Sequence, residues 1–216
     1  MTQMSLHIIV ISISMLASLT LYFQKNTPFY LKTFPVFLII TIGVELTGLW
    51  LTKNRITNAW LFNWFTTVEF VYYLYILRCI IVSAKVKKLI GILMVLYPVV
   101  VFFNIYFVLR HTQFHTVTYS IGCLLVAAIC VYYFFELFQL SKSTTLVREP
   151  AFWICSGLLF FYCCSFPLFG MWNLLNSVSN VIIRNIDYIL KFLNTLLYSM
   201  FTIGFLCRLR VKKPGS

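Results

Sequence analysis

Charged residues are scarce in this chain, and acidic residues are the scarcest. Lys and Arg together number 17, Asp and Glu only 5, and charged residues make up 10% of the sequence. Because soluble domains hold about a quarter charged residues, this composition excludes an ordinary soluble domain. The hydrophobic fraction is 61% and the mean hydropathy is +0.92. The apolar residues fall in runs of about 20, the length that a bilayer core requires, so the bilayer itself is the first expected partner.

The chain also lacks the sequence patterns of several functional classes. The seven cysteines all lie inside apolar runs, which argues against a disulfide framework and against a thiolate metal site, and favours packing roles. No nucleotide-binding loop or protease motif is present, and no catalytic constellation stands out. We therefore expect no enzymatic activity and no cofactor. The net charge of +12 does not indicate nucleic acid, because the basic residues lie in short loops between apolar runs.

Seven apolar runs predict seven transmembrane helices in one domain, residues 1–207, followed by a short basic tail, 208–216. Helices are expected because each backbone group in a bilayer must be satisfied within its own segment. The predicted spans are 6–23, 34–51, 59–82, 89–109, 119–139, 151–172 and 186–207. The fold class is thus all-α, a seven-helix membrane bundle.

The basic residues of the loops predict the orientation of the bundle. One set of loops holds most of them: Lys25, Lys32, Arg78, Lys85, Lys87, Lys88, Lys142, Arg148 and, in the tail, Arg208, Arg210, Lys212 and Lys213. The other set holds only Lys53, Arg55, Arg110 and Arg184. The richer set is expected in the cytoplasm, which puts the N-terminus outside and the C-terminus inside.

A weak internal similarity is consistent with a 3+1+3 repeat. Pro35 and Pro150 both stand near a predicted helix start, and Gly43 and Gly157 follow at nearly the same offset. Spans 1–3 and 5–7 then share one orientation. Repeats of this kind occur in transporters and put the substrate site between the halves.

The last span carries a polar stripe. Asp187, Lys191, Asn194, Tyr198 and Thr202 recur at steps of four, three, four and four residues, which places them on one face of a helix. Such a face is expected toward the bundle interior or a wet cavity. The alternative is a seam that only joins helices by hydrogen bonds.

Two carboxylates in other spans join this stripe as candidates for a ligand site or an ion path. Glu45 lies in the outer half of the second span, and Glu69 lies near the middle of the third. Ionisable residues inside spans are functional candidates by default. We expect an outer-half polar cavity lined by spans 2, 3 and 7. Glu136, near the inner end of span 5, is expected at the membrane interface.

Metal binding has little support in the sequence. His111 and His115 are four residues apart, as zinc-binding pairs on a helix can be. However, they flank a loop and no carboxylate motif accompanies them, so we expect no metal site.

The segments REPAFWICSGLLFFYCCSFPLFGMWNLL, VEFVYYLYILRCII and LLYSMFTIGFLCRL carry a family resemblance that covers most of the chain. The sequence resembles an uncharacterised group of bacterial seven-span inner-membrane proteins. The resemblance implies a bacterial cytoplasmic membrane and brings no established activity.

A second resemblance concerns the stretch DYILK, which is similar to the D-x-x-x-K of the seventh helix of microbial rhodopsins. The resemblance implies retinal bound to Lys191. Two departures weigh against it: only Glu69 is deep in the third span, and Lys191 is five residues into its span, a shallow position from which lysine usually reaches the interface.

Two functional hypotheses therefore stand first. One is a sensor that binds a ligand in the outer half of the bundle and acts through a cytoplasmic signalling partner. The other is a small-solute or proton-coupled transporter that uses the buried carboxylates. A membrane enzyme is the third hypothesis, retinal binding is a remote alternative, and homo-oligomerisation is left open.

Overall fold

The computed structural model describes residues 5–24, 26–109, 113–139, 146–171 and 180–207, with the side chains of residues 5 and 180–184 excepted. Every regular element in these ranges is helical, as the sequence predicts. The seven long helices are α1 (Ser5–Leu19), α3 (Phe34–Lys53), α4 (Ala59–Ile80), α5 (Ala84–Phe103), α6 (Thr116–Gln139), α7 (Pro150–Gly170) and α9 (Asn180–Cys207). The short elements are η1 (Thr20–Phe23), α2 (Phe29–Lys32), η2 (Asn104–Val108) and η3 (Leu146–Arg148).

These boundaries follow the predicted spans closely, with two differences. Helix α5 begins at Ala84 and α9 at Asn180, several residues before the apolar runs at 89 and 186. The added turns carry polar residues such as Lys87 and Arg184. A prediction from apolar runs excludes such residues, although Lys and Arg have a high helix propensity. Pro35 and Pro150 both occupy the first turn of a helix, where the missing amide hydrogen costs nothing.

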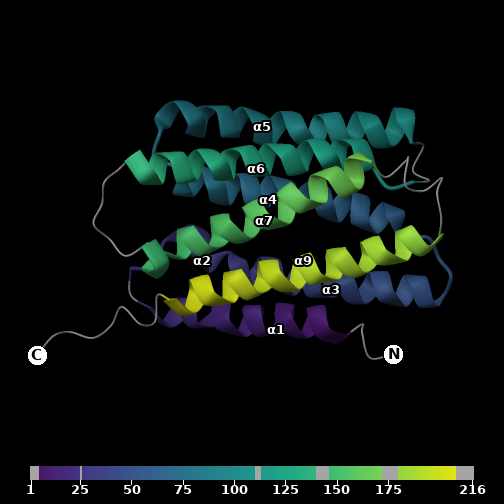
Figure 1. Ribbon diagram of the computed structural model, residues 1–216, viewed down its shortest axis with the longest axis horizontal. Coiled ribbons are helices and arrows are strands. Elements are labelled where there is room, and N and C mark those ends of the chain that lie inside the picture. The colour runs from purple at the N-terminus through teal and green to yellow at the C-terminus, as the bar shows by residue number, and fades with distance from the viewer. Residues whose placement is uncertain (1–4, 25, 110–112, 140–145, 172–179, 208–216) are drawn as a thin grey trace, which may run out of the picture.

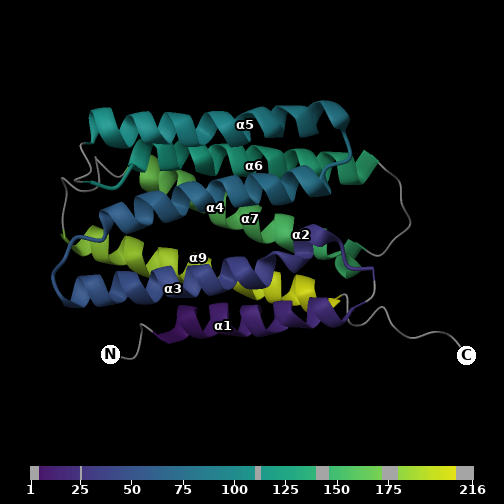
Figure 2. The ribbon, with the colours of Figure 1, turned by 180° about the vertical axis from the view of Figure 1, so that it is seen from behind.

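The helices lie side by side in two layers. Figure 1 shows α6, α7 and α9 in front, with α5 along one edge and α1 along the other. Seen from behind, α4 and α3 form the other layer (Figure 2). We call the end of the bundle at which α1, α4, α6 and α9 begin the amino end, and the opposite end the carboxyl end.

Six of the long helices are long and apolar enough to cross a membrane. The exception is α4, whose 22 residues include Asn63, Glu69 and Arg78. Large apolar side chains cover much of the outer surface; Val95 is 69% exposed and Phe107 72%. Because water would make such a surface unstable and lipid would not, these features fit a multi-pass membrane protein.

Glycines bring α7 and α9 close together. A Cβ atom added at Gly157 would lie 3.2 Å from Leu197 and Met200, and one at Gly204 would lie 3.2 Å from Trp153. Small residues allow this approach in lipid, where helix association depends on close packing. Among the described residues, nothing lies within 4 Å of a Cβ added at Gly43, so the two glycines of the suggested repeat have different surroundings.

Candidate functional site

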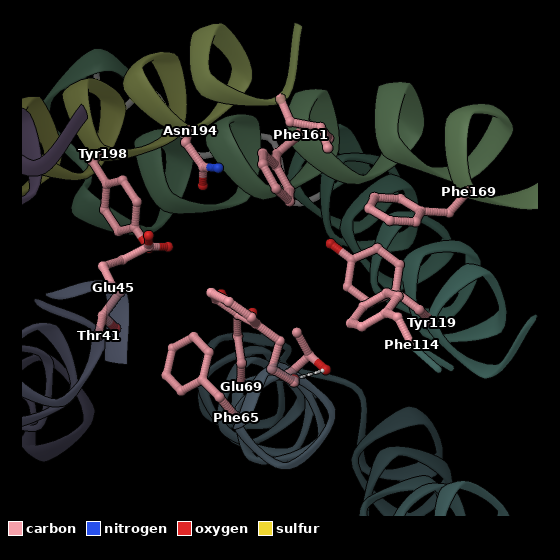
Figure 3. Close-up of a pocket in the computed structure, with 13 residues that line it drawn as sticks. Thr41, Glu45, Phe65, Glu69, Phe114, Tyr119, Phe161, Phe169, Asn194 and Tyr198 are labelled. Carbon is pink, nitrogen blue, oxygen red and sulfur yellow. Dashed lines mark hydrogen bonds between the residues drawn. The ribbon is translucent and has the colours of Figure 1, made fainter. Parts of the chain in front are cut away.

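A cavity of about 290 Å³ lies in the amino-end half of the bundle (Figure 3). Its walls come from α3, α4, α6, α7 and α9 and from the residue two positions before α6. The lining residues are Thr41, Glu45, Phe62, Phe65, Thr66, Glu69, Phe114, Tyr119, Phe161, Phe169, Leu190, Asn194 and Tyr198. Residues far apart in the sequence therefore meet around one space.

The polar groups of the cavity come from different helices and converge. Glu45 of α3 and Asn194 of α9 point into the space from one side, and the hydroxyl of Tyr119 of α6 points into it from the other (Figure 3). Glu69 of α4 lines the same space. Convergent polar groups in a mostly apolar pocket are the usual form of a small-molecule site.

Glu45 is anchored from behind the cavity. The Nε2 atom of His7 on α1 lies 3.4 Å from Oε2 of Glu45. The His7 side chain is 7% exposed and the Glu45 side chain 24%, so the contact lies in a largely buried place. It holds one oxygen of Glu45 toward α1, and the carboxylate remains at the cavity wall.

Glu69 has a different environment. Among the described residues, the ion pairs are His7 with Glu45 and Lys191 with Asp187, and neither includes Glu69. Its electrostatic neighbours include Glu45 and the hydroxyls of Tyr73, Tyr119 and Tyr198. Since a charge in low dielectric needs a partner, the Glu69 carboxyl group requires either a proton or a bound cation.

Aromatic rings surround these polar groups. Tyr119 and Phe169 pack with ring centroids 4.4 Å apart, and Phe114 lies 5.4 Å from Tyr119. Four rings that are at most 1% exposed pack against one another beside the cavity and form what we call the aromatic floor: Phe70, Tyr73, Tyr162 and Phe201. None of these four residues lines the cavity itself.

The connection before α6 is held over α4 by an amide. Nδ2 of Asn63 donates a hydrogen bond to the carbonyl oxygen of Gln113 (3.0 Å), and Oδ1 of Asn63 accepts one from the amide of His115 (3.1 Å). Asn63 is 1% exposed. These two bonds bracket Phe114 and so position its ring in the cavity wall, a role that a single asparagine in the sequence did not indicate.

His115 is a structural residue in this arrangement. Its Nε2 atom lies 2.9 Å from the hydroxyl of Thr66, and its Nδ1 atom lies 2.8 Å from the hydroxyl of Thr118. Burial lowers the pKa of His115 to about 4, because burial disfavours the charged ring. Both nitrogens are thus engaged in the neutral ring, and neither is free for a metal.

Metal ligation finds no further support in the described ranges. No group of three His, Cys, Asp or Glu side chains that could hold an ion occurs among the residues described. His111, the second residue of the suggested pair, lies outside these ranges.

The polar stripe of the last span divides in the structure. Asn194 and Tyr198 line the cavity, whereas Asp187, Lys191 and Thr202 do not. Lys191 donates a hydrogen bond to Asp187 one turn away, and the Asp187 side chain is 57% exposed. The Thr202 hydroxyl donates to the carbonyl of Tyr198 in its own helix. The stripe therefore begins at an exposed ion pair, and only its middle residues, Asn194 and Tyr198, line the cavity.

No family model, curated protein or solved structure matches this chain.

Proposed function

We propose that the chain is a seven-span membrane protein of the bacterial cytoplasmic membrane that binds a small ligand in the cavity and signals through a cytoplasmic partner. The observation that carries this proposal is the convergence of Glu45, Glu69, Asn194 and Tyr119 on one cavity. These groups come from four helices, so a ligand that contacts them would bias how the helices pack. A ligand shifts a protein only toward a state that it binds better.

The assignment of α4 as the seventh span is supported by its place in the bundle. It has 22 residues, enough to cross about 30 Å at 1.5 Å per residue. It lies between α3 and α5 (Figure 2) and contacts α6. Its polar side chains Asn63 and Thr66 are buried, so they lower the hydropathy of the helix without meeting lipid.

The orientation is supported by the distribution of basic residues. Lys32, Arg78, Lys85, Lys87, Lys88 and Arg148 all belong to the carboxyl end of the bundle. Short loops rich in Lys and Arg stay in the cytoplasm. The cavity would then face the outside, and the aromatic floor would separate it from the cytoplasm.

A transporter is the second candidate. Glu69 favours it, because a carboxyl group that has no cation partner among the described residues can exchange a proton for a solute. The first-turn prolines of α3 and α7 support the suggested repeat. Transport would require the aromatic floor to open. Retinal binding has less support, because Lys191 is paired with Asp187 outside the cavity lining.

Cysteine labelling tests the cavity. In a variant whose native cysteines are replaced by alanine, single cysteines at positions 45 and 69 should react with a membrane-impermeant maleimide added from outside. A cysteine at Leu158, which is fully buried, is the matched control and should stay unlabelled. Absence of labelling at both 45 and 69 would contradict the proposal.

Two further measurements separate the sensor from the transporter. Co-purification of a cytoplasmic kinase or regulator with the wild-type protein would favour the sensor. Proton flux into pyranine-loaded proteoliposomes that is lost in Glu69→Gln would favour the transporter.

A further inference from the structure

We propose that the ligand of the cavity is a small organic cation, a primary to quaternary ammonium with an apolar substituent. This inference rests on the proposed ligand cavity and adds the chemical class of its occupant. It follows from three properties of the lining: its charge, its aromatic walls and its size.

The ionisable groups of the lining are both acidic. Two carboxyl groups, Glu45 and Glu69, reach the cavity, and none of the 13 residues that line it is Lys, Arg or His. His7 contacts Glu45 through one oxygen from outside the lining, so it can compensate one carboxylate. Glu69 is left without a cation among the described residues. An anionic ligand would meet repulsion here, and a cation would supply the missing partner.

The walls of the cavity are suited to an ammonium group. Seven of the lining side chains carry aromatic rings: Phe62, Phe65, Phe114, Tyr119, Phe161, Phe169 and Tyr198. Ring faces attract cations through their quadrupoles, and groups of rings are the usual recognition device for alkylated ammonium ions.

The positions of the polar groups and of the aromatic rings indicate how a ligand would be oriented in the cavity. Glu45 and Asn194 lie on one side of the space, while Tyr119, Phe114 and Phe169 lie on the other (Figure 3). A ligand with the ammonium toward the carboxylates would place its apolar part against the Phe114–Tyr119–Phe169 wall. The volume of about 290 Å³ is at the small end of ligand pockets, which favours a compact amine over a bulky drug-like cation.

Benzyltrimethylammonium is a suitable probe, because it is permanently charged, compact and aromatic. Equilibrium binding of the radiolabelled cation to purified full-length protein in detergent should be saturable. Glu69→Gln should weaken binding at least about tenfold, since it removes the uncompensated charge. Phe161→Leu should weaken it by about threefold to thirtyfold, because it removes a ring face but keeps an apolar side chain.

The controls separate charge from general apolar binding. Glu149→Gln removes an exposed carboxylate at the start of α7, away from the cavity, and should leave the affinity unchanged. Benzyl alcohol and benzenesulfonate are neutral and anionic probes that should compete weakly or not at all. Thermal melting of Glu69→Gln in detergent verifies that the variant is folded.

Two outcomes would overturn the inference. If benzyl alcohol competes as well as the cation and Glu69→Gln binds normally, the cavity binds ligands but does not select cations, and the proposed function stands. If the cation does not bind and cysteines at 45 and 69 are also unlabelled from outside, both the inference and the proposed function fail.

Discussion

The Nε2 atom of His115 lies 2.9 Å from the hydroxyl oxygen of Thr66, which ties the residue before α6 to the second turn of α4. The other ring nitrogen contacts Thr118, and the His115 ring is fully buried. Because Phe114 is the preceding residue and lines the cavity, this buried pair determines where one wall of the site stands.

The buried neutral ring predicts that the protein loses stability in acid. Burial lowers the pKa of His115 from 6.5 to about 4, so the unfolded chain binds the proton more strongly. The His115 contribution is full above pH 6.5, is lost as the pH falls toward 4, and changes no further below that. At about 1.4 kcal/mol per unit of pKa difference, the loss is at most about 3.5 kcal/mol.

Thermal unfolding in detergent between pH 7.5 and 4 measures this loss. Carboxyl groups titrate in part of the same range, so the difference between wild type and His115→Gln isolates the histidine. The melting temperature of the variant should be lower than that of wild type at pH 7.5, and it should fall less as the pH is lowered. Parallel pH profiles for the two proteins would contradict the assignment.

Glu136 is predicted to stabilise the turn between α4 and α5. Its carboxylate oxygens accept hydrogen bonds of 2.8 Å from the amides of Val82 and Ser83, just before α5 begins. Bonds of this kind are charge-assisted, and the negative group also favours a helix start. Glu136→Ala should lower the free energy of unfolding by about 1–3 kcal/mol. Glu136→Gln, which keeps one acceptor oxygen, should lose less.

Glu149→Ala is the matched control for that measurement. Glu149 also precedes a helix, but its side chain makes no cap hydrogen bond and is exposed. Its replacement should change the free energy of unfolding by no more than about 0.5 kcal/mol. Equal losses in the two alanine variants would show that the bonds to Val82 and Ser83 contribute nothing of their own.

The sequence predicted the helices well because long apolar runs have few alternatives in a bilayer. Of the seven candidates that charge and periodicity indicated, Glu45, Glu69, Asn194 and Tyr198 line one cavity, and the other three do not. The sequence did not indicate the hydrogen bond that Asn63 donates to Gln113, because this bond joins α4 to a connection 50 residues further along the chain. The aromatic residues of the cavity wall were not indicated either, since Phe also occurs throughout these helices as a packing residue.

The polar stripe shows a second limit of sequence reasoning. Helical periodicity aligns Asp187 with Tyr198, but it does not say how far along the helix its neighbours extend. Asp187 lies in a part of α9 that is open, with a side chain 57% exposed, while Tyr198 is 2% exposed. The same face of one helix therefore meets different surroundings at its two ends.

The close contact of α7 with α9 predicts opposite effects for two glycine substitutions. Gly157→Leu would push a side chain against Leu197 and Met200, whose atoms lie 3.2 Å from the added Cβ. Such overpacking should cost about 1–3 kcal/mol. Gly43→Leu is the matched control, because no other described residue comes within 4 Å of a Cβ added there. It should be neutral or stabilise the helix by up to about 1 kcal/mol.

Melting temperatures of the two glycine variants in the same detergent provide the comparison. A Gly157→Leu protein as stable as wild type would mean that α7 and α9 can separate without loss. In that case the position of Phe161 in the cavity wall would not depend on the glycine contact.

The exposed pair Asp187–Lys191 is predicted to be nearly dispensable. The two side chains are four residues apart on one helix and are 57% and 34% exposed, and exposed pairs with this spacing contribute about 0.3–0.5 kcal/mol. Asp187→Asn and Lys191→Gln should therefore melt close to wild type. Neither residue lines the cavity, so both variants should also bind benzyltrimethylammonium with the wild-type affinity, in contrast to Glu69→Gln.

Lys191 also allows a direct test of the retinal hypothesis. Purified protein incubated with retinal should show no visible absorbance band. A band that disappears in Lys191→Gln would establish Lys191 as a retinal attachment site and would place the ligand away from the carboxylates.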